Sequence, residues 1–135
     1  MTATATASIP RKRILFVEDD EDTQELMLFL LGDYGYEVVI AASVSNALEC
    51  AKSGGLALCI LDHWFTESNG IELCEQIRAF DPDTPIVFYS GAGYKADIEK
   101  GLAAGAQAYL VKPDLDRLKE AIDRLTEEPT FNTVH

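Results

Sequence analysis

Residues 13–22 read RILFVEDDED, in which an apolar run passes directly into a run of acids. Four or five consecutive apolar residues rich in Val and Ile are typical of a strand that is buried on both faces of a sheet. Comparable runs recur along the chain, each followed by apolar residues at helical spacing. The five runs are Arg13–Val17, Glu37–Ala41, Ala57–Leu61, Pro85–Tyr89 and Ala108–Val111.

Strands that alternate with helices form parallel sheets with helices on both faces. The sequence therefore predicts an α/β fold, a doubly wound (βα)5 sheet with strand order 2-1-3-4-5. We expect Leu26, Phe29 and Leu30 on the inner face of the first helix. Ser43 or Ser45 is expected to cap the second helix, which Gly54 and Gly55 end. Residues 11–128 are expected to form one domain, between a leader at 1–10 and a tail at 129–135.

The composition narrows the class of partner. The chain has 135 residues, of which 47% are apolar, and a net charge of −12. This acidity argues against nucleic acid and anionic membranes as partners, since both bind basic surfaces. The longest apolar runs hold six residues, whereas a membrane-spanning helix needs about 20. Three cysteines without metal-ligand spacing predict reduced, buried thiols in a cytoplasmic protein: Cys50, Cys59 and Cys74.

Polar residues follow four of the five runs. Glu18 and Asp19 follow the first, Asp62 the third, Ser90 the fourth, and Lys112 the fifth. Ligands of such sheets bind beyond the carboxyl ends of the strands, where the strand order reverses. We therefore expect these side chains to converge in one crevice.

Crowded carboxylates either raise their pKa or hold a cation, and oxygen-only ligands favour Mg²⁺. We expect Asp19 and Asp62 to bind Mg²⁺ directly and Glu18 to act through water. A carboxylate at a strand end can attack a phosphoryl group, whose oxygens need positive partners. The set thus predicts an aspartyl phosphate at Asp62, with the Lys112 ammonium and the Ser90 hydroxyl contacting phosphate oxygens.

These motifs resemble the receiver domain of two-component response regulators, of the CheY-like superfamily. The matching stretches are ILFVED at 14–19, Asp62 with Gly70 eight residues later, PIVFYSG at 85–91 and AGAQAYLVKP at 104–113. The resemblance covers residues 11–128 and implies a flavodoxin-like receiver fold. It implies a domain that is phosphorylated at Asp62 by a histidine kinase or a phosphotransfer protein and then switches a protein-interaction face. Because only six residues follow Pro129, we expect the domain to stand alone.

The resemblance also implies a role for each matching residue. Glu18 and Asp19 would form the acidic pair, Ser90 would be the switch hydroxyl, and Tyr109 the switch aromatic. Lys112 would be the active-site lysine, joined to Pro113 by a cis bond, and the Trp64 backbone carbonyl would be a further Mg²⁺ ligand. The chain departs from the usual pattern in the loop after Asp62 and after Pro113, at Phe65, Thr66, Asn69 and Asp114.

Other functions fit single motifs. Residues 91–96, GAGYKA, match a loose dinucleotide-binding pattern, which belongs in the first strand–helix turn of a larger fold. An aspartate-nucleophile phosphatase needs a second acid where Trp64 stands, so an enzyme beyond self-phosphorylation and slow autodephosphorylation is not expected. A receiver-like interaction module that is independent of phosphorylation is the main alternative. His63 is interpreted as an exposed loop residue, because hard cations prefer oxygen ligands.

Overall fold

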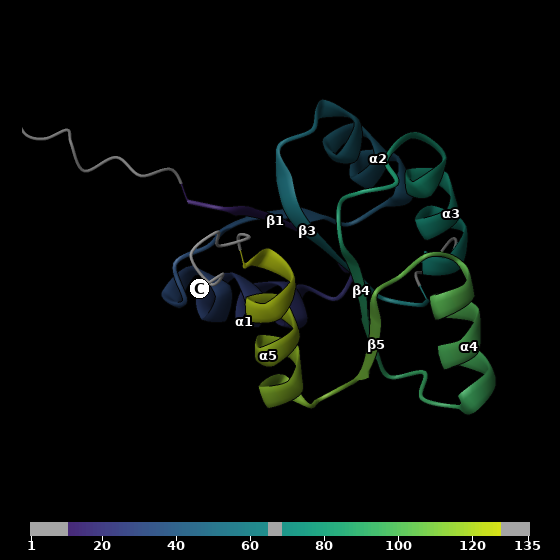
Figure 1. Cartoon of the computed structure of the whole chain (residues 1–135). Helices are drawn as coiled ribbons and strands as arrows, with labels where there is room; N and C mark the ends of the chain where they lie inside the picture. Colours follow the sequence, from purple (N-terminus) through teal and green to yellow (C-terminus); the bar gives the residue numbers. More distant parts are fainter. Residues whose placement is uncertain (1–10, 65–68, 128–135) are drawn as a thin grey trace, which may run out of the picture.

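The computed structural model describes residues 11–64 and 69–127. Five strands form one parallel sheet in the order β2-β1-β3-β4-β5, as the sequence predicts (Figure 1). The strands are β1 (Arg13–Val17), β2 (Glu37–Ala41), β3 (Leu56–Leu61), β4 (Ile86–Ser90) and β5 (Ala108–Val111). The helices are α1 (Glu21–Asp33), α2 (Val44–Ser53), α3 (Gly70–Phe80), α4 (Lys95–Ala103) and α5 (Leu115–Thr126).

The strand register brings the carboxyl ends to a common edge. Val17, the last residue of β1, lies opposite Ala41 of β2 and Leu61 of β3. At the other end of the strand order, Ser90 of β4 lies opposite Val111 of β5. The residues that follow these strand ends therefore leave the sheet side by side, which places the candidate site at this edge.

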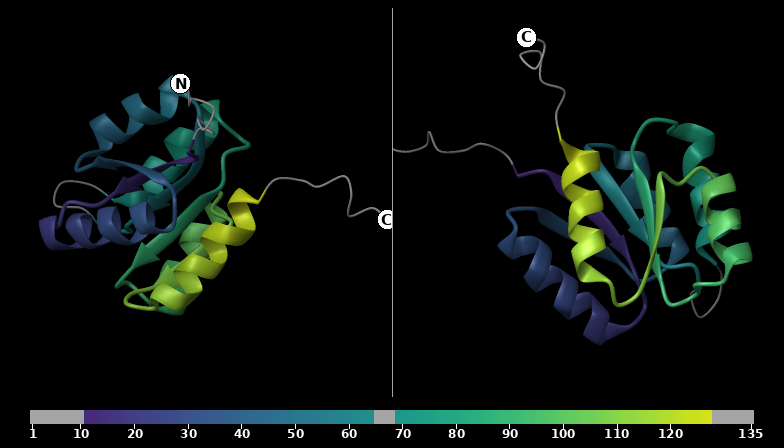
Figure 2. Two further views of the ribbon diagram at one scale, coloured as in Figure 1. Left: turned by 90° about the vertical axis from the view of Figure 1, so that its left-hand side faces the viewer. Right: turned by 60° about the horizontal axis from the view of Figure 1, so that its bottom comes forward.

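Helices cover both faces of the sheet, with α1 and α5 on one face and α2, α3 and α4 on the other (Figure 2). Alternation along β1 separates two cores, since side chains of consecutive strand residues point to opposite faces. Ile14 and Phe16 pack with α1 and α5, while Leu15 and Val17 pack with α2 and α3. All four side chains are buried. The doubly wound prediction is confirmed.

The inner face of α1 differs from the predicted one. Met27 and Leu31 are buried against the sheet, whereas Leu26 and Phe29 are 46% and 72% exposed. Apolar residues surround this helix, so spacing alone fits more than one face, and packing on the sheet selects the pair at i and i+4. The prediction for Leu26 and Phe29 is wrong.

A side chain caps the first turn of four helices, α1, α2, α3 and α5. Ser43, one of the two predicted caps, accepts a hydrogen bond from the Asn46 N–H. Asn69 caps α3 by accepting from the Glu72 N–H, and Asp114 caps α5 by accepting from Arg117. Asn69 and Asp114 are both departures from the usual receiver pattern, and capping explains why a short polar side chain suits each position.

Several sequence-based predictions fall outside the described residues. They are the leader at 1–10, the residues from 128 onward that include the tail, and the loop departures Phe65 and Thr66. Within the described ranges, none of the helices has the length and apolar character needed to cross a membrane.

Candidate functional site

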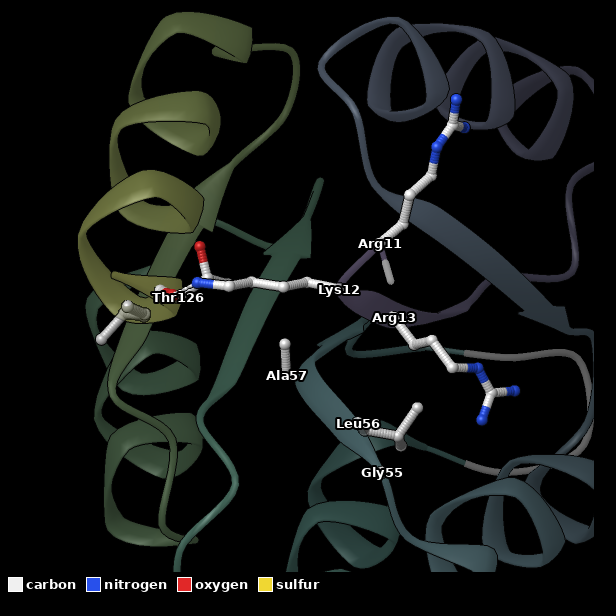
Figure 3. A pocket seen from close by; sticks show the side chains of 8 residues that line it. Arg11, Lys12, Arg13, Gly55, Leu56, Ala57 and Thr126 are labelled. Carbon is white, nitrogen blue, oxygen red and sulfur yellow. Dashed lines mark hydrogen bonds between the residues drawn. The ribbon is translucent and has the colours of Figure 1, made fainter. Parts of the chain in front are cut away.

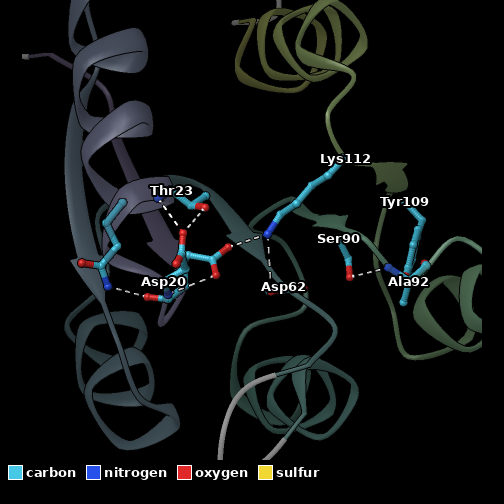
Figure 4. A network of polar contacts seen from close by, with 9 residues as sticks. Asp20, Thr23, Asp62, Ser90, Ala92, Tyr109 and Lys112 are labelled. Atoms are coloured by element: carbon cyan, nitrogen blue, oxygen red, sulfur yellow. Dashed lines mark hydrogen bonds and ion pairs between the residues drawn. The ribbon is translucent and has the colours of Figure 1, made fainter.

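Three charged side chains meet at the carboxyl edge of the sheet, and we call them the acidic half of the site: Glu18, Asp62 and Lys112 (Figure 4). The Lys112 ammonium donates a hydrogen bond of 2.8 Å to Glu18 Oε1 and lies 3.5 Å from Asp62 Oδ2. The Glu18 side chain is only 2% exposed, and that of Asp62 is 13% exposed. The structure thus brings together residues from three separate strand ends, as the sequence predicts.

Backbone hydrogen bonds hold these three residues in place. The Glu18 N–H donates to the Ala41 carbonyl, and the Asp62 N–H donates to the Val17 carbonyl. The Lys112 N–H donates to the Ser90 carbonyl, and the bond between Lys112 and Pro113 is cis, as the resemblance implies. Each charged side chain therefore begins from a backbone that is still part of the sheet ladder.

Burial sets the electrostatics of the acidic half. It raises the pKa of Glu18 above the ordinary value, while the hydrogen bond and charge of Lys112 oppose that rise. Burial alone would lower the pKa of Lys112, but Glu18 and Asp62 together raise it above the ordinary value. Lys112 is thus held as a cation between two carboxylates, and a charged Glu18 depends on it.

The acidic residues that follow β1 have different places in the structure. Asp19 is half-buried beside Glu18 at the edge of the sheet. Asp20 instead caps α1, since its carboxylate accepts hydrogen bonds of 2.9 Å from the Thr23 N–H and 2.6 Å from the Thr23 hydroxyl. These bonds lower the pKa of Asp20. Sequence reasoning did not find this cap, although an Asp just before a helix is a typical signal for one.

A second group of side chains lies beside the acidic half, and we call it the aromatic half: His63, Phe88, Ser90 and Tyr109. The Tyr109 hydroxyl donates 2.7 Å to the Ala92 carbonyl, and Ser90 Oγ accepts 3.1 Å from the Ala92 N–H. Tyr109 is 9% exposed and Ser90 is 1% exposed. Burial raises the pKa of Tyr109 to about 12, with a hydrogen bond from Ser90 acting in the opposite direction.

His63 was expected to be an exposed loop residue, and that interpretation is wrong. It is 2% exposed, and its Nδ1 lies 2.7 Å from the Tyr109 hydroxyl. Its ring stacks on Trp64 with centroids 4.7 Å apart and meets Phe88 at 6.0 Å. The reason is tertiary: the aromatic surface of Phe88 and Tyr109 receives the imidazole. The signal that could have found it is its place two residues after the end of β3, a buried strand.

Trp64 is 57% exposed and covers His63 from the solvent side. The role of its backbone carbonyl as a metal ligand stays a prediction. Gly70 is required close by, because a Cβ at that position would lie 2.0 Å from the Asp62 carbonyl oxygen.

The donor set of the acidic half suits Mg²⁺. Mg²⁺ needs only one or two carboxylates and keeps several waters, so it does not require a cage of protein side chains. Across residues 11–64 and 69–127, no three His, Cys, Asp or Glu side chains are grouped closely enough to hold a metal by themselves. Asp62 and Glu18 offer oxygen only, and both already face the Lys112 ammonium.

The opposite, amino-terminal end of the sheet carries a basic hollow of about 450 Å³ (Figure 3). Its cations do not converge on one point. Lys12 donates to the Thr126 carbonyl, Arg13 pairs with Glu37 at 3.6 Å, and the guanidinium groups of Arg11 and Arg13 point apart in Figure 3. Lys12 thus ties the end of α5 to β1, and the hollow shows no arrangement for an anion.

The prediction of buried thiols is confirmed for Cys59 and Cys74 but not for Cys50. All three are free, Cys59 and Cys74 are buried, and Cys50 is half-buried. Burial raises the pKa of Cys59 to about 12 and that of Cys74 to about 11. These two thiols therefore stay protonated and pack as small apolar side chains.

Comparison with known proteins gives one consistent family. A family model described as "Response regulator receiver domain" matches residues 14–123. The chain is 33% identical over 129 residues to a probable transcriptional regulator, ycf27, of Cyanophora paradoxa. That match covers 93% of this chain and 54% of the relative. The chain spans about half the length of the curated relatives it matches.

Solved structures share the fold. The response regulator TrrA of Thermotoga maritima, in complex with Mg²⁺–BeF, is 32% identical with a TM-score of 0.77, over 84% of this chain and 98% of that one. The receiver domain of the sensor histidine kinase PA1611 from Pseudomonas aeruginosa is 25% identical with a TM-score of 0.80, over 88% and 100%. It has a magnesium ion coordinated in its active site cleft.

Proposed function

The chain belongs to the response regulator receiver domain family, and on that premise we propose that it accepts a phosphoryl group on Asp62. One observation carries the proposal: the Asp62 carboxylate and the buried Glu18 carboxylate share a single ammonium, that of Lys112, at the carboxyl edge of the sheet. A nucleophilic oxygen and a fixed positive charge therefore stand together where ligands of such sheets bind.

In the proposed reaction, an Asp62 oxygen attacks the phosphorus of a phosphohistidine on a sensor kinase or phosphotransfer protein. The new O–P bond forms as the N–P bond breaks, and the electron pair of that bond returns to the imidazole nitrogen of the donor, which binds a proton. Lys112 lies close enough to Asp62 to neutralise charge on the transferred oxygens. The product is an aspartyl phosphate on this chain and a free histidine on the partner.

Mg²⁺ is the proposed cofactor, and two solved structures similar to this chain contain the ion. Asp19, Asp62 and the Trp64 carbonyl would hold the ion, and Glu18 would act through water. When bound, Mg²⁺ neutralises negative charge on the transferred phosphoryl group. The residues of this chain supply the rest: a buried acid that keeps Lys112 charged, and backbone anchors that fix both carboxylates to the sheet.

Ser90 and Tyr109 would convert phosphorylation into a change of surface. The Ser90 hydroxyl is close to Tyr109 and can turn to donate to a phosphate oxygen instead. Tyr109 lies on β5 beside α4, so its contacts connect the site to that face of the domain. The proposed output is a protein contact on this face, by a shift between existing states.

The proposal includes a cytoplasmic location, since three free thiols suit a reducing compartment. It includes protein partners and no nucleic acid contact by this domain, because the net charge is −12. It also limits catalysis by the domain to its own phosphorylation and slow autodephosphorylation.

The test uses a small phosphodonor, such as acetyl phosphate, on the whole chain with and without Mg²⁺. We expect the mass of one phosphoryl group to be added to wild type in the presence of Mg²⁺. When EDTA removes the ion, we expect no such addition. Asp62→Asn should abolish incorporation, while Asp116→Asn, an exposed acid on α5, should not change it. No incorporation into folded wild type would contradict the proposal and favour a phosphorylation-independent interaction module.

A further inference from the structure

The strongest unassigned feature is the buried contact between His63 and Tyr109. His63 is among the few polar side chains that the described residues bury almost completely, with 2% exposure. It lies within contact of three rings, Trp64 at 4.7 Å, Phe88 at 6.0 Å and Tyr109 at 5.9 Å between centroids. The proposed phosphoryl chemistry gives this imidazole no task.

The direction of the hydrogen bond follows from the partners. The Tyr109 hydroxyl has one hydrogen, which it donates to the Ala92 carbonyl at 2.7 Å. At the 2.7 Å contact with His63, the hydroxyl must therefore accept, and Nδ1–H of the imidazole donates. His63 and the Ala92 carbonyl thus both hold the hydroxyl oxygen of Tyr109 by hydrogen bonds.

The ring of Tyr109 is also held by packing. It stacks on Phe88 with centroids 5.2 Å apart and an angle of 20° between planes. Gly101 of α4 makes the space, since a Cβ there would lie 2.5 Å from Tyr109 Cδ2 and 3.1 Å from Phe88 Cδ2. The hydroxyl and the ring of Tyr109 are therefore both held inward, and none of these contacts involves a phosphoryl group.

We propose that His63 is a positioning residue that holds Tyr109 in the interior of the unmodified domain. The face between α4 and β5 is then already biased toward one state before Asp62 reacts. A single hydrogen bond of this kind shifts such an equilibrium by about two- to tenfold. The consequence for phosphorylation rests on the proposed function, but the position of Tyr109 does not.

The measurement is fluorine NMR of the whole chain with ring-fluorinated tyrosine, without a phosphodonor. The five tyrosines give five signals, and the one lost in Tyr109→Phe belongs to Tyr109. The solvent isotope shift of that signal reports its exposure. In Gly101→Ala, the added methyl group takes the space that the Tyr109 ring occupies. This variant supplies the reference signal for an outward Tyr109.

The decisive variants are His63→Phe and His63→Asn. Phe keeps an aromatic ring and removes the donor, whereas the Asn amide can place an N–H near the position of Nδ1. We expect wild type and His63→Asn to show Tyr109 inward. His63→Phe should lower the ratio of inward to outward Tyr109 about two- to tenfold, or produce an outward signal that wild type lacks. Circular dichroism confirms that each variant is folded.

An outward Tyr109 in wild type would overturn the proposal. So would a Tyr109 signal in folded His63→Phe that is unchanged from wild type. A further arm measures the rate of labelling by acetyl phosphate, which we expect to fall about two- to tenfold in His63→Phe and to recover in His63→Asn. If wild type takes no phosphoryl group, the proposed function fails, yet the NMR comparison still decides the role of His63.

Discussion

The acidic and aromatic halves of the site share one edge of the sheet but differ in how their polar groups are satisfied. In the acidic half, two carboxylates depend on the single ammonium of Lys112, and burial raises the pKa of Glu18. In the aromatic half, the Tyr109 hydroxyl forms hydrogen bonds with His63 and Ala92, and its ring packs against Gly101.

This difference separates two tasks. The acidic half carries an excess of negative charge in a buried place, so a cation is stabilising there. The aromatic half is already paired, so a change in it requires the exchange of one hydrogen bond for another. We therefore expect the acidic half to respond to charge and ions, and the aromatic half to respond to shape.

The largest expected effect comes from breaking the acidic half with Lys112→Met. Glu18 loses its hydrogen-bonded counterion while it stays buried, so the free energy of unfolding should fall by about 2–3 kcal/mol. This is below the full cost of a broken buried pair because the Lys112 side chain is 25% exposed. Denaturant unfolding at neutral pH measures the loss.

Lys119→Met is the matched control for that prediction. Lys119 also makes a 2.8 Å ion pair, with Asp123, but the two side chains are 43% and 51% exposed. Its loss should lower the free energy of unfolding much less than the loss of Lys112 does. Equal losses in the two lysine variants would show that burial does not distinguish the acidic half.

A smaller loss of stability is expected when Gly101→Ala overpacks the aromatic half. The added methyl group meets the Tyr109 ring at 2.5 Å, and such overpacking should lower the free energy of unfolding by about 2 kcal/mol. In Gly32→Ala on α1, the new Cβ meets no atom within 4 Å, and a helical Ala should stabilise by about 0.5–1 kcal/mol. A stabilised Gly101→Ala variant would contradict the packing described for Tyr109.

Magnesium should act on the acidic half alone. At a concentration ten times the dissociation constant, Mg²⁺ should raise the free energy of unfolding of wild type by about 1.4 kcal/mol. Asp62→Asn should lose most of this gain, and His63→Phe should keep it. Thermal unfolding with and without Mg²⁺ measures both, and an equal gain in all three proteins would mean that the ion binds elsewhere.

The smallest expected effect lies outside both halves and calibrates the response to acid. Asp81 accepts a 2.5 Å hydrogen bond from the Thr84 hydroxyl as well as backbone N–H bonds, and these lower its pKa. Its contribution to stability is therefore present at neutral pH and is lost as the pH falls below about 3.8. Asp81→Asn should lower the melting temperature by a few degrees at pH 7, and this difference should vanish at acid pH.

The contrast between the halves also explains what the sequence could predict. Five apolar runs with polar residues after them are enough for the strand order and for the convergence of Glu18, Asp62 and Lys112. This works because parallel strands end at one edge whatever the details of packing. The roles of the site residues in phosphoryl transfer stay predictions until they are tested.

His63 and the inner face of α1 could not be predicted in this way. Whether His63 is buried depends on Phe88 and Tyr109, which come from two other strands, and no local pattern encodes that contact. On α1, apolar residues occur on more than one face, so periodicity did not single out Met27 and Leu31. Both errors concern tertiary packing rather than the order of elements.

The most direct test of the central claim locates the phosphoryl group on the chain. After reaction with acetyl phosphate and Mg²⁺, borohydride reduces an aspartyl phosphate to homoserine, which peptide mass spectrometry places in the sequence. We expect homoserine at position 62 and unmodified acids at positions 18 and 19. Reduction at another acid, or at none while the chain is folded and Mg²⁺ is present, would contradict it.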